Sequence, residues 1–210
     1  MKEIYNNYKK EIKKTNNILV LILVIFVIGL IFGSIYITIL KNPEKQSIMT
    51  QVNNYFLSMN KISFETQIII FKNSLISNLL YFIFIWLLGL SIIGIPIIIL
   101  MVFFKSFILG FSVSSIFAKY GAKGILGAFI YIFPSSLTIC IFTIFLSTYS
   151  LILAFKLLQA AFTKKTINFR TFMGKYFFVL LVAVLLSVLC SLIDAFLSPH
   201  LYKIFTNFIK

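Results

Sequence analysis

Few side chains in this sequence could carry out acid–base, nucleophilic or metal chemistry. There are five acidic residues among 210, one histidine and two cysteines. His200 lies in the short C-terminal segment, whereas Cys140 and Cys190 lie within apolar runs. The sequence contains no HExxH zinc motif, no paired intramembrane aspartates, no Ser–His arrangement at membrane depth and no glycine-rich phosphate loop. It therefore predicts no enzymatic activity, no metal site and no cofactor.

Lys105 and Asp194 are the two ionisable residues that we expect at membrane depth. A charged side chain there costs about 2.5–3.5 kcal/mol on insertion scales and marks a functional candidate by default. One interpretation is a buried pair, or a path for protons or ions. The other places each residue near a different membrane interface, with Lys105 towards the inside and Asp194 near the outer end of the last span. The expected topology favours this second interpretation.

Glycines and prolines interrupt the apolar run between residues 86 and 124. A break in a membrane helix frees backbone groups that only neighbouring protein can satisfy, so such breaks indicate a specific folded interior. We expect the main break between Gly94 and Lys105, and we assign structural roles in helix breaking and packing to eight residues. These are Gly89, Gly94, Pro96, Lys105, Gly110, Gly121, Gly124 and Pro134.

A GxxxG pattern lies within the first apolar run, at Gly29 and Gly33. Small residues at this spacing let a second helix approach closely. Gly110 and Ser114 repeat the small-xxx-small pattern. Packing within the chain and formation of a homo-oligomer both remain open on this evidence.

The elements that must position these residues are membrane helices. The chain is 60% hydrophobic and 11% charged, whereas soluble domains are about 25% charged. Runs of about 20 apolar residues are long enough to span the bilayer. We expect an all-α, polytopic transmembrane helical bundle of about five spans, with a broken or re-entrant segment near residues 94–105. Its parts are a basic N-terminus (1–17), the first span (18–40), an amphipathic segment (41–74), a transmembrane core (75–197) and a C-terminal tail (198–210).

The formal net charge of +14 does not indicate nucleic-acid binding, because the lysines are spread over short segments between apolar runs. That distribution fits anionic lipid headgroups and the positive-inside rule. Residues 1–17 and 156–175 are the densest in Lys and Arg, so we expect both in the cytoplasm. Segment 41–74, the turn at 119–123 and the C-terminus would then lie outside.

Apolar residues recur at helical spacing within the segment 41–74, which predicts an amphipathic helix. One interpretation is a helix that lies in the membrane interface. The other is a docking surface for an extracytoplasmic partner, and the two are compatible. The residues concerned are Ile48, Val52, Tyr55, Phe56 and Met59.

Three blocks resemble the stage II sporulation protein M family of bacterial membrane proteins. They are WLLGLSIIGIPIIIL at 86–100, FFKSFILGFSV at 103–113 and YGAKGILGAFIYIFPSS at 120–136. Ser106 stands where the family pattern often has a glycine after the lysine. The resemblance implies a non-catalytic scaffold in the septal or engulfing mother-cell membrane during endospore formation. It also implies two peptidoglycan-degrading partners, the stage II sporulation proteins D and P.

Two other functions remain open. A small transporter or channel would use the broken helices around Gly94 and Pro134, because transporters bind substrates at such interruptions. The chain could also be a plain oligomeric membrane protein of a permease accessory type.

Overall fold

The computed structural model describes residues 2–58, 63–163 and 169–209, and all regular structure within these ranges is helical. The α-helices are α1 (Lys2–Ile39), α2 (Asn42–Ser58), α3 (Phe64–Gly89), α4 (Gly94–Tyr120), α5 (Gly124–Tyr131), α6 (Leu137–Thr163), α7 (Phe169–Leu192) and α8 (Ser198–Ile209). A 3-10 turn, η2 (Gly121–Lys123), follows α4, and two π-helical turns are η3 (Ile132–Ser136) and η4 (Ile193–Leu197).

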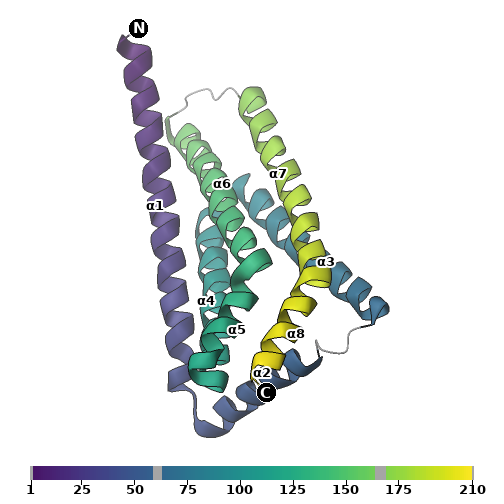
Figure 1. The fold of residues 1–210 in the computed structure, drawn as a ribbon. Coiled ribbons are helices and arrows are strands. Elements are labelled where there is room, and N and C mark those ends of the chain that lie inside the picture. Colours follow the sequence, from purple (N-terminus) through teal and green to yellow (C-terminus); the bar gives the residue numbers. More distant parts are fainter. Residues whose placement is uncertain (1, 59–62, 164–168, 210) are drawn as a thin grey trace.

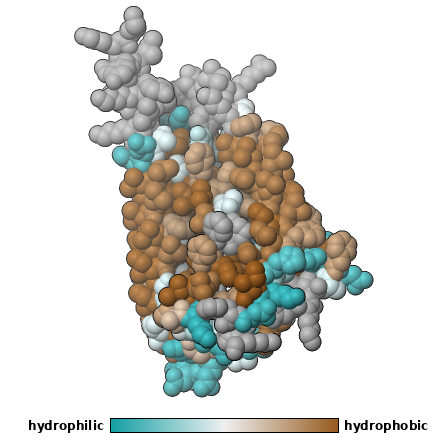
Figure 2. All heavy atoms as spheres, in the orientation of Figure 1, coloured by the Kyte–Doolittle hydropathy of each residue, from teal (hydrophilic) through white to brown (hydrophobic). Residues whose placement is uncertain are grey.

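Five helical segments within the described ranges are long and apolar enough to cross a membrane. They are Thr15–Ile39, Phe64–Gly89, Gly94–Tyr131, Leu137–Phe162 and Tyr176–Asn207. Hydrophobic side chains form a broad band across the visible face of the molecule, and hydrophilic ones gather towards its lower end (Figure 2). The predicted all-α, polytopic membrane bundle of about five spans is therefore confirmed.

The helices form an upright bundle that α2 crosses at one end (Figure 1). The N-terminus lies at the opposite end, whereas the C-terminus lies beside α2. We call the end that holds α2, η2 and α8 the α2 end. The first helix, α1, packs mainly against α4, and α3 packs against α6 and α7.

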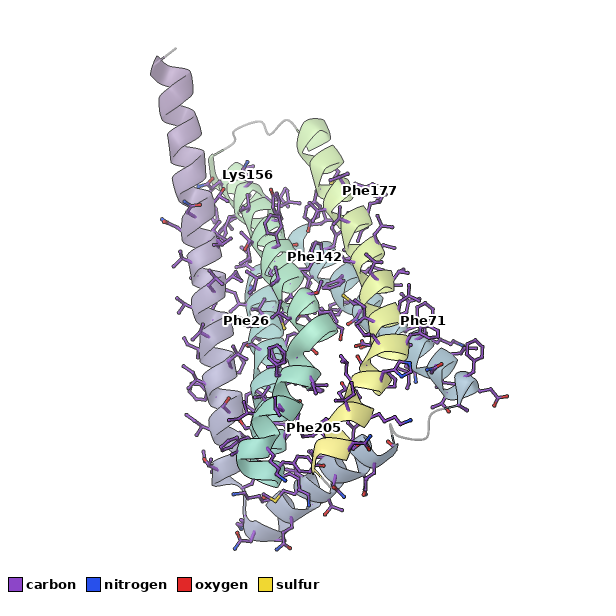
Figure 3. The ribbon with its side chains drawn as sticks, viewed as in Figure 1. Phe26, Phe71, Phe142, Lys156, Phe177 and Phe205 are labelled. Atoms are coloured by element: carbon purple, nitrogen blue, oxygen red, sulfur yellow. The ribbon has the colours of Figure 1, made fainter. Side chains whose placement is uncertain are left out.

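The core of the bundle surrounds α6. Of the most apolar window of this span, 61% is buried, compared with 17–28% for the other four spans. Phe142 of α6 lies near the centre of the bundle and Phe205 lies at the α2 end (Figure 3). The remaining spans each bury one side and expose large apolar side chains on the other, as expected of helices that face lipid.

The break between the second and third spans lies at residues 90–93, just before the predicted interval of 94–105. Helix α4 is continuous through that interval. The reason is the position of Pro96, which lies in the first turn of α4, where a missing N–H removes no intrahelical hydrogen bond. Backbone hydrogen bonds within the turn, such as that from Gly94 N to Ser91 O (3.1 Å), satisfy its polar groups.

Pro134 does not end a helix either. It lies within η3, through which α5 runs directly into α6. A π-helical turn accommodates an extra residue in a continuing helix, and it occurs often at functional sites. The second π-helical turn, η4, joins α7 to α8 in the same way. The segment predicted as a C-terminal tail is consequently a helix, α8, with Tyr202 and Phe205 buried.

Candidate functional site

The GxxxG pattern of α1 forms a seam with α4 inside the chain. A methyl group at Gly29 would collide with Ser106 Oγ, and one at Gly33 would collide with the Phe107 carbonyl oxygen. On the facing helix, a methyl group at Gly110 would collide with the Leu30 carbonyl oxygen. Both glycines of the pattern thus let two backbones approach closely, so the structure uses the pattern for internal packing.

A second close contact lies at the end of the bundle opposite the α2 end, beside the 90–93 turn. A methyl group at Gly89 would collide with the Tyr176 hydroxyl. That hydroxyl donates a hydrogen bond to the Trp86 carbonyl oxygen (2.7 Å), so Ser150 Oγ, at 2.9 Å, is the donor to Tyr176. The carbonyl groups in the last turn of a helix have no intrahelical partner. Tyr176 therefore supplies the partner that the Trp86 carbonyl oxygen would otherwise lack at the end of α3.

Three other predicted glycines lie at turns or close contacts of the backbone. A methyl group at Gly94 would collide with the Leu88 carbonyl oxygen across the 90–93 turn. Gly121 has a φ of 59°, a conformation that side chains with a Cβ rarely adopt, and it ends α4. Gly124 follows two residues after this glycine, and a Cβ on it would lie 2.8 Å from the Ile116 carbonyl oxygen. Gly121 and Gly124 thus let α5 turn back closely along α4.

Lys105 lies well inside α4, away from either end of the helix. It is the twelfth residue of α4, which places it about 17 Å along the helix, near the middle of a span. Its ammonium group lies 4.9 Å from the centre of the Tyr81 ring, which is the geometry of a cation–π interaction. The Tyr81 hydroxyl in turn donates to the Met101 carbonyl oxygen (3.2 Å). Aromatic contact thus provides this lysine with a partner inside the bundle.

Asp194 accepts hydrogen bonds from side chains of two other elements. Ser74 Oγ of α3 donates to Asp194 Oδ2 (2.7 Å), and Ser135 Oγ of η3 donates to Oδ1. Asn78 Nδ2 adds a third hydrogen bond to this network by donating to Ser74 Oγ (3.2 Å). The carboxylate therefore joins the two π-helical turns to α3. We call these four residues the Asp194 cluster.

Sequence reasoning did not find the partners of Asp194. Ser74, Asn78 and Ser135 are separated from it by up to 120 residues, so no local spacing connects them. The available signal was polar side chains within apolar runs, which usually face a protein interior. No ion pair joins Asp194 to Lys105, both of which lie in the described part of the chain. The described ranges also contain no group of three or more His, Cys, Asp or Glu that could hold a metal ion.

The apolar face of α2 covers the α2 end of the bundle, which corrects part of the predicted docking surface. Phe56 is 1% exposed, and its ring contacts those of Tyr120, Tyr202 and Phe205. Its side chain is therefore unavailable to a partner. The reason is that the hydrophobic face of an amphipathic helix finds a larger apolar surface on its own chain than in solvent.

The other residues of the predicted surface differ in exposure. Ile48 and Val52 are half-buried on the inward side of α2, whereas Tyr55 is 42% exposed. Met59 lies outside the described residues. The Tyr120 hydroxyl fixes α2 to the end of α4 by donating to Asn53 Oδ1 (3.2 Å).

The family model for Stage II sporulation protein M matches residues 22–199. The match runs from the first span to the start of α8, and it includes the glycine seam, the 90–93 turn and the Asp194 cluster. No curated protein and no solved structure matches the chain.

Proposed function

The chain belongs to the stage II sporulation protein M family, and we propose that it is a non-catalytic scaffold that positions peptidoglycan-degrading partners during engulfment. The family match over residues 22–199 is the observation that carries this proposal, since membership implies a sporulation membrane protein of engulfment. The proposed partners are the stage II sporulation proteins D and P, which would supply the hydrolytic chemistry. The proposed location is the septal or engulfing mother-cell membrane.

We propose that the α2 end faces the cell wall. The N-terminal segment is basic, and the positive-inside rule would place it in the cytoplasm. An odd number of spans then brings α2, η2 and the C-terminus to the outer side. Peptidoglycan lies on that side, so this is where a scaffold would meet enzymes that act on the wall.

The polar face of α2 is the best-placed contact surface for such partners. Most of its exposed side chains are neutral and capable of hydrogen bonding, which suits a protein interface rim, and Glu44 adds one negative charge in the first turn. They include Ser47, Thr50, Gln51 and Asn54. Because Phe56 and Val52 anchor the opposite side of α2, this polar face is held rigidly at the end of the bundle.

Affinity purification from sporulating cells tests the scaffold. We would place the tag at the N-terminus, because α8 packs within the α2 end, and identify bound proteins by mass spectrometry. We expect both wall-degrading partners with the unmodified chain and neither with Thr50→Glu/Asn54→Glu. A matched control, Asn16→Glu/Asn17→Glu, changes two exposed residues near the opposite end and should retain them. Recovery of the chain alone, while other membrane complexes stay intact, would contradict the proposal.

Transport is a second candidate function, and the Asp194 cluster is the observation that favours it. Acidic residues within membrane spans mark ion and proton pathways, and this one joins two irregular helical turns. Proton and sodium flux into liposomes that contain the purified chain tests this function. Flux that Asp194→Asn or Lys105→Ala abolishes would support it. Absence of flux, together with a normal partner complex in both variants, would exclude it.

A further inference from the structure

A cavity of about 640 Å³ lies between the ends of α1, α4 and α5 and the start of α2. Its lining is almost entirely apolar, and this volume falls within the range of small-molecule sites, about 300–1,000 Å³. We call it the α1–α5 groove. It lies at the α2 end but within the spanning helices, so its surroundings are the acyl region and the headgroup region of one leaflet.

The walls of the α1–α5 groove expose large apolar side chains. Three of its large side chains, Phe117, Ile125 and Phe129, are each more than half exposed in the isolated chain. Its lining runs from Ile125 of α5 to Ile132, the first residue of η3, a rise of about 10 Å. An acyl chain that runs from the interface towards the bilayer centre can therefore lie along this side of α5.

One charged side chain lines the α1–α5 groove. Lys45, in the first turn of α2, is half-buried at the groove's interfacial end. No acidic residue lines the groove. Lys41 and Lys119 are exposed at the same end of the bundle, so the surrounding field is also basic, although Glu44 lies next to Lys45 in the sequence. A groove with apolar walls and a lysine at one end is complementary to the acyl chain and the charged headgroup of an anionic phospholipid.

We propose that the α1–α5 groove binds an anionic phospholipid, with one acyl chain along α5 and the headgroup phosphate at Lys45. A neutral lipid would fill the same walls but would not compensate the charge of Lys45. A second copy of the chain would bury that charge against an apolar or like-charged surface, which is unfavourable. Basic pockets between membrane helices bind anionic headgroups by this combination of contacts.

Lipid retention by the purified full-length chain tests the proposal. The chain would be exchanged into mixtures of phosphatidylglycerol and phosphatidylcholine with identical acyl chains, and native mass spectrometry would measure the bound lipid. One lysine near an anionic surface supports a preference of about fivefold for phosphatidylglycerol. Lys45→Gln should abolish that preference, whereas Lys41→Gln, which changes an exposed lysine that does not line the groove, should preserve it.

A second variant distinguishes the groove from general surface charge. Ala118 lines the α1–α5 groove and is half-buried, so Ala118→Phe should fill part of it and reduce retention of both lipids. Equal retention of the two lipids by the unmodified chain would overturn the proposal, as would equal effects of Lys41→Gln and Lys45→Gln. A dimer that Ala118→Phe converts to monomer would instead identify the occupant as a second copy and overturn it too.

Discussion

Trp86 of α3 and Tyr176 of α7 bind each other through two reciprocal hydrogen bonds. The Trp86 indole N–H donates to the Tyr176 carbonyl oxygen (3.1 Å), and the Tyr176 hydroxyl donates to the Trp86 carbonyl oxygen (2.7 Å). Their rings stack at 5.2 Å with 14° between the planes. Two spans that are separated by about 90 residues are thereby fixed in register at one end of the bundle.

Removal of the Tyr176 hydroxyl should destabilise the fold. Tyr176→Phe leaves the Trp86 carbonyl at the end of α3 without its donor, at a cost of about 1–3 kcal/mol for a buried group. We expect a lower midpoint of thermal unfolding in detergent, measured by the change in intrinsic fluorescence. Tyr149→Phe is the control, because the Tyr149 hydroxyl has no hydrogen bond within the described residues. Equal midpoints for the two variants would show that the hydroxyl pairing contributes little.

Larger residues at the α1–α4 seam should prevent normal assembly. Gly33→Leu or Gly110→Leu forces apart two backbones that touch in the structure, so we expect less protein in membranes and a broadened size-exclusion peak. Gly174→Leu is a matched control, because a Cβ there meets nothing within 4 Å. Normal accumulation of the seam variants would contradict the assigned role of these glycines.

The Asp194 cluster should behave as a coupled unit. A double-mutant cycle between Asp194→Ala and Ser135→Ala should give a coupling free energy of about 0.5–3 kcal/mol, as for residues in contact. The neighbouring Ser136 donates instead to the Tyr131 carbonyl oxygen (3.2 Å), so Ser136→Ala should couple only weakly to Asp194→Ala. Thermal or denaturant unfolding of the four purified variants in each cycle supplies the free energies. Similar coupling for Ser135 and Ser136 would argue against a specific hydrogen bond.

Truncation of Phe56 should loosen the α2 end. Phe56→Ala opens a cavity among three aromatic rings, and such changes cost about 3–5 kcal/mol in protein cores. We expect a markedly lower unfolding midpoint and faster proteolysis of α2. Leu57→Ala, one position along and 48% exposed, should leave both measurements almost unchanged. A similar response from the two variants would mean that α2 is not anchored through Phe56.

The spans were predictable because hydrophobic length is a local property. Each crossing needs about 20 apolar residues, and that requirement is visible in any window of the sequence. The position of the break between the second and third spans was harder to predict from the sequence. Pro96 suggested an interruption within 94–105, but a proline in the first turn of a helix is compatible with that helix. Gly89 and Gly94 flank the 90–93 turn and were predicted as packing positions, but only the structure shows that they lie against Tyr176 and Leu88.

The environment of Asp194 and the inward face of α2 depend on long-range contacts, which spacing does not encode. Ser74 and Ser135 resemble ordinary small polar residues of membrane helices, and only the fold brings them to one carboxylate. The helical spacing of Ile48, Val52 and Phe56 predicts one apolar face, and in the structure Phe56 is buried while the other two are half-buried. It could not tell whether that face would meet lipid, a partner or the chain's own helices, because hydrophobic burial has no directional preference.

The pairing of α1 with α4 has a consequence for biogenesis. The first helix leaves the ribosome well before its main partner, since the whole of α2 and α3 is synthesised between them. At about 5–20 residues per second, that interval lasts roughly 3–11 seconds. During this time Gly29 and Gly33 of α1 lie in the bilayer without α4, where they can pair with other helices or be reached by membrane proteases. Synthesis of α4 therefore sets the earliest moment at which the nascent chain can become resistant to quality control.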